Sequence, residues 1–401
     1  MLCPSVSNFS VDLNIESGDM STTLQYWSHL SSVSTGELSE AAILHLSNLP
    51  SLQYLKFRLP LLPISADTRK LLQRPAFHAL RQLDIECDTL ELLDTFLETL
   101  SIALRVLSIT ITCQVNTTRA LPASISCLSK ACAHTSLQQV QINIEDWSFD
   151  GDGDAIGAAA FQPLYAMRNL RKLDLDVAVF AHLDDAGLLQ MAKAWPLLEE
   201  FYFNKTILSL HNVTPNAFVS LLQHCPCLVS VGIAVDWSTI DKHDISPNVP
   251  YQGFTHDALS QVFFGASKIS HPTRIAAFIS AIAPNLESIE AWSPDFHGHD
   301  QDFHKYSGRW NLVRYLIKSF SMVREQGRRM ILNAGEGTDE NVRGPCGCYG
   351  VVQPAQETEN RETAVGGDIG WGGEGPKEGN GSESDYMPHS EHVSSEEEDE
   401  E

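Results

Sequence analysis

The chain has 401 residues, 43% of them hydrophobic, and a formal net charge of −24. This composition supplies a sizeable core, while the negative charge argues against nucleic-acid phosphates as a ligand. No apolar run approaches the roughly 18 residues of a membrane helix, and the start Met1-Leu2-Cys3-Pro4-Ser5 lacks signal-peptide character. The 9 cysteines are scattered and odd in number. We therefore expect a cytoplasmic or nuclear protein with no membrane partner and no nucleic-acid partner.

A pattern of apolar residues at positions 1, 4 and 6 recurs along the chain and predicts a series of short strands. From Leu52 onward the copies begin 28, 24, 33, 33, 28, 30 and 58 residues apart, which is the length class of leucine-rich repeats. The copies are Leu52-Leu55-Phe57, Leu80-Leu83-Ile85, Leu104-Leu107-Ile109, Leu137-Val140-Ile142, Leu170-Leu173-Leu175, Leu198-Phe201-Phe203, Leu228-Val231-Ile233 and Leu286-Ile289-Ala291, after a weaker Val6-Phe9-Val11.

Short amphipathic helices are predicted between these strands. Ser39, Asp184 and Thr214 stand where an N-cap oxygen is wanted, and a proline ends each helix, as at Pro196 and Pro226. Because the crossovers are long enough to bring successive strands parallel, we expect right-handed strand–helix–strand units.

One of these helix ends reads His224-Cys225-Pro226-Cys227, which could hold a metal ion or exchange disulfides. Cys225 falls at the position that Leu49, Trp195 and Ala283 occupy in other copies. A buried thiol behaves as a small hydrophobe. We therefore expect Cys225 to be a core residue.

The predicted fold is α/β: a leucine-rich-repeat solenoid with a parallel β-sheet on the concave side and helices on the convex side. We assign residues 1–308 to the solenoid and residues 309–332 to a capping helix that buries Val313, Leu316, Ile317, Phe320 and Val323. Residues 333–401 carry 18 acidic and 3 basic residues and many glycines. This composition predicts a disordered acidic tail.

Strand alternation places the side chains between the core positions on the concave face, where we expect a protein partner to bind. The predicted strand with Tyr54, Lys56 and Arg58 is basic on this face, and the middle strands are acidic and amide-rich. The predicted binding residues are Tyr54, Lys56, Arg58, Gln82, Asp84, Glu86, Gln139, Gln141, Asn143, Lys172, Asp174, Asp176, Glu200, Tyr202, Asn204, Glu290 and Trp292.

Three other stretches are rich in possible metal ligands. Residues 150–154 (DGDGD) lack the glycine and glutamate that a calcium loop requires at its sixth and twelfth positions. Residues 295–304 (DFHGHDQDFH) and the pair Cys346 and Cys348 lack a second element of fixed spacing. We find no catalytic constellation, and therefore expect no metal, no cofactor and no enzymatic activity.

The helix–Cys-Pro-x-Leu–strand unit, as at Cys225-Pro226-Cys227-Leu228, resembles the cysteine-containing leucine-rich repeat of F-box proteins. The segments from Pro284 to Trp292 and from Val323 to Arg329 resemble the end of the solenoid in a large fungal branch of that family. The resemblance implies the substrate-recognition part of a Skp–cullin–F-box ubiquitin ligase. No F-box motif is recognisable, so contact with the Skp–cullin machinery would require one upstream. The alternative is a free-standing interaction scaffold with no role in ubiquitination.

Overall fold

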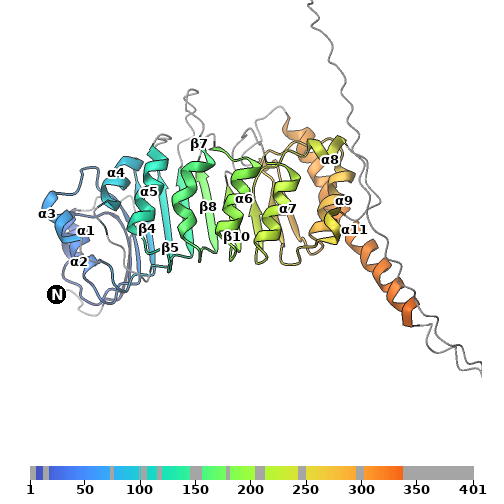
Figure 1. Cartoon of the computed structure of the whole chain (residues 1–401). Helices are drawn as coiled ribbons and strands as arrows, with labels where there is room; N and C mark the ends of the chain where they lie inside the picture. The colour runs from blue at the N-terminus through green and yellow to red at the C-terminus, as the bar shows by residue number, and fades with distance from the viewer. Residues whose placement is uncertain are drawn as a thin grey trace, which may run out of the picture. The chain divides into compact units, whose positions relative to one another are not determined.

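Figure 1 shows the computed structural model of the chain. The structure describes residues 6–11, 18–72, 76–98, 100, 106–114, 120–144, 156–177, 181–203, 213–242, 250–294 and 302–336. They all belong to one compact unit, Met1–Asp339. The predicted tail beyond Glu336, the glycine-rich acidic run at 150–154 and most of the His-rich run at 295–304 lie outside these residues.

One parallel sheet runs through this unit, and its 11 strands are hydrogen-bonded in chain order. This confirms the predicted α/β solenoid. The strands are β1 (Asn8–Ser10), β2 (Ser32–Glu37), β3 (Tyr54–Arg58), β4 (Gln82–Cys87), β5 (Ser108–Cys113), β6 (Gln139–Ile144), β8 (Lys172–Val177), β10 (Glu200–Phe203), β11 (Ser230–Gly232), β12 (Gln261–Phe263) and β13 (Ser288–Glu290). A separate parallel pair joins β7 (Ile156–Gly157) to β9 (Ala181–His182).

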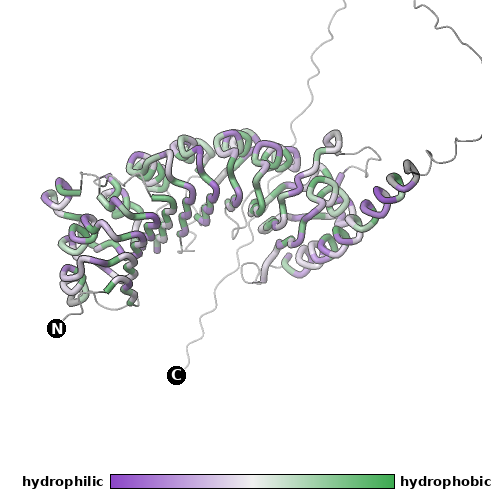
Figure 2. Tube along the Cα trace, turned by 90° about the horizontal axis from the view of Figure 1, so that it is seen from below, coloured by the Kyte–Doolittle hydropathy of each residue, from purple (hydrophilic) through white to green (hydrophobic). Residues whose placement is uncertain are grey.

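Helices connect successive strands and lie along one face of the sheet (Figure 1). They are α1 (Gly18–Leu24), α2 (Glu40–Ser47), α3 (Ala66–Leu72), α4 (Leu90–Leu97), α5 (Leu121–Ala131), α6 (Asp185–Ala194), α7 (Pro215–His224), α8 (Ser238–Lys242), α9 (Pro272–Ile282) and α11 (Phe303–Glu336), with 3₁₀ helices η2 (Ala158–Ala166) and η3 (Pro250–Gly253). In Figure 2 the strands line the inner side of a curve and the helices its outer side.

The core lies between the sheet and the helices. At its centre, one row of apolar side chains runs across the sheet, each paired in register with the next. Each of these buried side chains contributes about 1.5–3 kcal/mol relative to an exposed one. The row consists of Val33, Leu55, Leu83, Ile109, Val140, Leu173, Phe201, Val231, Val262 and Ile289.

Two strands of the main sheet, β2 and β12, were not predicted, and neither was the separate pair β7 and β9. In the repeat that contains β2 the inward residues are Leu30, just before the strand, and Val33 and Thr35 within it. Because Thr35 is polar, although only 2% exposed, the apolar pattern is incomplete here. In β12 a full copy begins at Leu259, but α8 before it has only 5 residues and no proline-terminated helix signals the repeat. The long interval between Leu228 and Leu286 therefore contains a complete repeat.

The predicted register of the strand after Leu104 is wrong by two residues. Ile109 pairs with Leu83 of β4, and Ile111 pairs with Ile85. The inward residues are therefore Val106, Ile109 and Ile111, all at most 2% exposed. Two overlapping apolar patterns fit this stretch, and pairing with the neighbouring strands selects the second.

The predicted helix ends are confirmed. The side chains of Ser39, Asp184 and Thr214 accept hydrogen bonds from backbone N–H groups in the first turns of α2, α6 and α7. Trp195 and Cys225 share nearly the same non-helical backbone at the helix C-terminus, with φ/ψ of −124/67° and −117/72°. This conformation suits a residue that precedes proline.

Carboxylates also tie successive helices together, a feature that the sequence pattern did not predict. Asp185 in α6 accepts hydrogen bonds from the N–H and hydroxyl of Thr214, both at 2.7 Å, at the start of α7. Asp241 in α8 accepts bonds from the N–H groups of Ser270 and His271 before α9, at 2.7 and 2.8 Å. Each acid thus satisfies donors at the N-terminus of the next helix.

Candidate protein-binding face

The side of the sheet that faces away from the described helices is here called the open face. It exists because successive side chains of a strand point to opposite sides. In β4, Leu83, Ile85 and Cys87 are buried against the helices, while Asp84 and Glu86 are partly exposed on the other side.

The register aligns the open-face residues into rows. Tyr54, Gln82 and Ser108 are paired neighbours in one row, and Gln139, Lys172 and Glu200 continue it. Lys56, Asp84 and Thr110 begin the second row, which runs through Gln141, Asp174 and Tyr202 and ends at Glu290. The third row consists of Arg58, Glu86, Thr112, Asn143 and Asp176.

The structure thus brings most of the predicted binding residues onto one surface, and their binding role stays a prediction. Asp174 is only 5% exposed, so a partner would have little access to it. Asn204 lies outside the described residues.

The prediction that Trp292 is a binding residue on the open face is wrong, because its side chain is only 1% exposed. The strand β13 ends at Glu290, and Trp292 adopts a left-handed φ of 54°. Its indole N–H then donates to the carbonyl of Ser267 at 2.9 Å, and its ring stacks on Tyr306 at 5.0 Å. The residue belongs to the packing of the last repeat and is unavailable to a partner on the open face.

The basic residues predicted on the open face are neutralised by acids of the next strand. Lys56 pairs with Glu86 at 3.0 Å and Lys172 pairs with Glu200 at 2.7 Å. Burial lowers the pKa of Lys172, but the hydrogen bond and charge of Glu200 outweigh it and raise the pKa overall. The local positive charge expected for β3 is therefore neutralised by the acidic side chains of β4.

Arg58 completes this set of ion pairs. Its guanidinium pairs with Asp88 and donates to the amide oxygen of Gln114 at 3.1 Å. The hydrogen bond to Asp88 raises the pKa of Arg58. Asp88 was not predicted because it follows the last residue of β4 and lies beyond the apolar pattern Leu80-Leu83-Ile85, although it continues the alternation of Asp84 and Glu86.

Acidic side chains outnumber basic ones on the described open face. The acids are Glu37, Asp84, Glu86, Asp88, Asp174, Asp176, Glu200 and Glu290, and the bases are Lys56, Arg58 and Lys172. The local field therefore favours a positively charged ligand. The phenol of Tyr54 responds to this environment: burial and the charge of Asp84 raise its pKa to about 12.

An aromatic patch lies on the same face toward the C-terminal repeats. The rings of Tyr202 and Phe263 meet edge to face at 5.7 Å, and the Tyr202 hydroxyl is 2.7 Å from the Ser230 hydroxyl. Gly232 makes room for this arrangement, because a Cβ there would lie 2.5 Å from Cδ1 of Tyr202. Aromatic side chains that are polar at one end suit protein interfaces. Phe263 was missed because its strand was not predicted.

The Cys225 and Cys227 pair separates into one core residue and one surface residue. Cys225 is 0% exposed, and its thiol lies 3.5 Å from the carbonyl oxygen of Trp195. Burial raises the pKa of Cys225 to about 12, whereas Cys227 is exposed. Within the described ranges, no group of three or more His, Cys, Asp or Glu side chains could hold a metal ion.

Among the same residues, no helix is both long and apolar enough to cross a membrane. No protein-family model matches the chain, and no curated protein matches it either. Among solved structures, the leucine-rich repeat-containing protein LegL7 from Legionella pneumophila is similar at 10% identity, with a TM-score of 0.37. The match covers 78% of this chain and 92% of that protein.

Proposed function

We propose that the chain is a protein-interaction solenoid that binds a basic segment of a partner protein on its open face. The observation that carries this proposal is the charge arrangement of the face. The described open face carries eight acidic and three basic side chains, and each of these bases is paired with an acid, so the net negative charge sets the field that a partner meets. Lysine or arginine side chains would complement these carboxylates, and the Tyr202 and Phe263 patch would accept an apolar or cationic group beside them.

A narrower form of the proposal follows from the resemblance to F-box proteins. The bound segment would then be the recognition signal of a ubiquitination substrate. The repeated turn at Trp195-Pro196 and Cys225-Pro226 supports this form, because that turn is the feature on which the resemblance rests. Co-precipitation with a Skp adaptor separates it from a scaffold with no role in ubiquitination.

Charge reversal at the centre of the open face tests the general proposal. Asp176 and Asn143 are paired neighbours, and Gln141 lies beside them in the adjacent row. The double variant Asp176→Lys, Gln141→Lys should abolish capture of a basic partner from an extract of cells that express the protein. The matched control is Asp67→Lys, Gln190→Lys, which makes the same two chemical changes at exposed helix positions.

The control variant should retain the partner, and both variants should keep the melting temperature of the parent chain to within a few degrees. Equal loss of the partner from both variants would show that total charge, and not the open face, governs binding. Retention by both would place the binding surface elsewhere.

A further inference from the structure

The last helix, α11, closes the solenoid with one of its faces. Trp310, Val313 and Ile317 are at most 3% exposed on that face. The guanidinium of Arg324 donates to the hydroxyl of Ser280 at 2.6 Å and the carbonyl of Ala277 at 3.2 Å, both in α9. Beyond Arg324 the helix continues past α9 (Figure 1).

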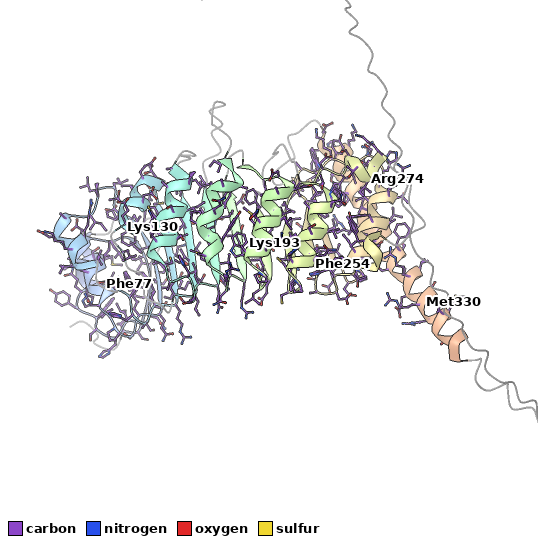
Figure 3. All side chains as sticks on the ribbon, in the orientation of Figure 1. Phe77, Lys130, Lys193, Phe254, Arg274 and Met330 are labelled. Carbon is purple, nitrogen blue, oxygen red and sulfur yellow. The ribbon has the colours of Figure 1, made fainter. Side chains whose placement is uncertain are left out.

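The opposite face of α11 carries apolar side chains that the described residues leave uncovered. Leu312, Tyr315, Met322, Val323 and Met330, here called the outer stripe, are 47%, 73%, 61%, 63% and 72% exposed. Their spacing places them on one side of a helix. The prediction that Val323 is buried is wrong, because its side chain is 63% exposed. Figure 2 shows hydrophobic and hydrophilic residues alternating along α11, and Figure 3 labels Met330 on its projecting end.

Half of the exposed large apolar side chains of the described residues lie on this one helix. The outer stripe spans 19 residues, and its two ends are about 27 Å apart at 1.5 Å per step. An apolar strip of this length matches an amphipathic helix laid alongside, with anchors at intervals of three, four and seven residues.

The charge of α11 differs in sign from that of the whole chain. From Leu312 to Ile331 it contains five basic residues, Arg314, Lys318, Arg324, Arg328 and Arg329, and one acid, Glu325, a net charge of +4. The whole chain has a net charge of −24. Glu325 already pairs with Arg329 at 2.9 Å and with Arg328 at 3.7 Å. The helical period places Arg314, Lys318 and Arg329 along one edge of the outer stripe.

We propose that the outer stripe docks an acidic amphipathic helix of a partner protein. Leucine-like side chains of that helix would cover Tyr315, Met322 and Met330, and its carboxylates would meet Arg314, Lys318 and Arg329. This site is separate from the open face of the sheet and does not depend on the function proposed for that face.

Charge favours this occupant over two others. A second copy of the chain would bring two helices of net charge +4 against each other, and like charges in close contact disfavour association. An anionic membrane would attract α11 but repel the rest of the acidic chain, whereas a single partner helix meets only α11 within the screening length of about 8 Å at physiological salt.

The probe is a labelled 21-residue peptide with leucine at two positions of each heptad and glutamate at the flanking positions. Fluorescence anisotropy would measure its binding to the full chain. We expect Met322→Glu to weaken binding by more than tenfold, and Lys318→Glu by about threefold or more. Leu62→Glu is the matched control, because Leu62 is 79% exposed and lies outside α11. It should change the affinity by less than about twofold.

The same peptide with lysine in place of glutamate should bind at least tenfold more weakly. Equal binding of the two peptides, or an equal effect of Met322→Glu and Leu62→Glu, would overturn the proposal. So would sedimentation of the chain as a dimer that Met322→Glu dissociates, because the occupant would then be a second copy. Binding to phosphatidylserine vesicles without binding to the acidic peptide would identify a membrane surface instead and would likewise overturn it.

Discussion

The hydroxyl of Ser267 links residues of the last repeats by hydrogen bonds. The decrease in the free energy of unfolding that follows its removal can be worked out from these contacts. Ser267 is 1% exposed. Its hydroxyl accepts a hydrogen bond from the N–H of Val235 at 2.8 Å and donates to the carbonyl of Phe264 at 2.5 Å. In Ser267→Ala the Phe264 carbonyl keeps the N–H of residue 267 at 3.0 Å as a donor. The buried N–H of Val235 loses its acceptor in this variant, because the Ser267 hydroxyl is the group to which it donates.

An unsatisfied buried donor costs about 1–3 kcal/mol, and we expect Ser267→Ala to lower the free energy of unfolding by that amount. Denaturant unfolding followed by tryptophan fluorescence is a suitable assay. The indoles of Trp292 and Trp310 both donate to the Ser267 carbonyl, at 2.9 and 2.8 Å, and so report on this region. Ser260→Ala is the control, since the Ser260 hydroxyl makes a 3.3 Å bond at the surface and its loss should cost less than about 0.5 kcal/mol. Equal costs for the two variants would refute the reasoning.

Three further predictions concern the core, the helix caps and the thiols. Leu173→Ala should cost about 2–5 kcal/mol in the same assay, while Gln141→Ala on the open face should cost less than about 0.5 kcal/mol, and equal costs would contradict the assignment of the two faces. Hydrogen bonds from the hydroxyls of Ser65 and Thr68 lower the pKa of Glu40. The stability that Glu40 adds should therefore be complete above its ordinary pKa of 4.5 and be lost as the pH falls through the lowered value; a melting-temperature difference between the parent and Glu40→Gln that grows on acidification would refute this. Iodoacetamide at neutral pH should modify Cys227 in the folded protein and Cys225 only after unfolding, as peptide mapping would show.

The fold was predictable because the repeat requires the same few side chains each time. Leu173 and Val231 occupy a position that only an apolar residue can fill, and Pro196 and Pro226 mark the helix ends. The prediction failed where that redundancy was broken. Thr35 buries a polar residue at a core position, and the short helix α8 gives no signal before β12.

The candidate site was predictable only as a set of positions. Alternation in the strands placed Asp84 and Gln141 on the open face. It could not show that Lys56 and Arg58 pair with acids of the next strand, because such pairs depend on side-chain reach across the register. It also could not show that the chain turns inward at Trp292, since a positive φ at tryptophan has no sequence signature.

The claim that the open face binds a protein partner is tested most directly by cross-linking from defined positions. A photo-reactive amino acid would replace Thr110 on the open face or Gln190 on the exposed side of α6, in the otherwise unchanged full chain. Mass spectrometry would then identify the cross-linked segment. The proposed function predicts cross-links from Thr110 to a lysine- or arginine-rich segment of one partner and none from Gln190. Cross-links to the partner from Gln190 alone would contradict it.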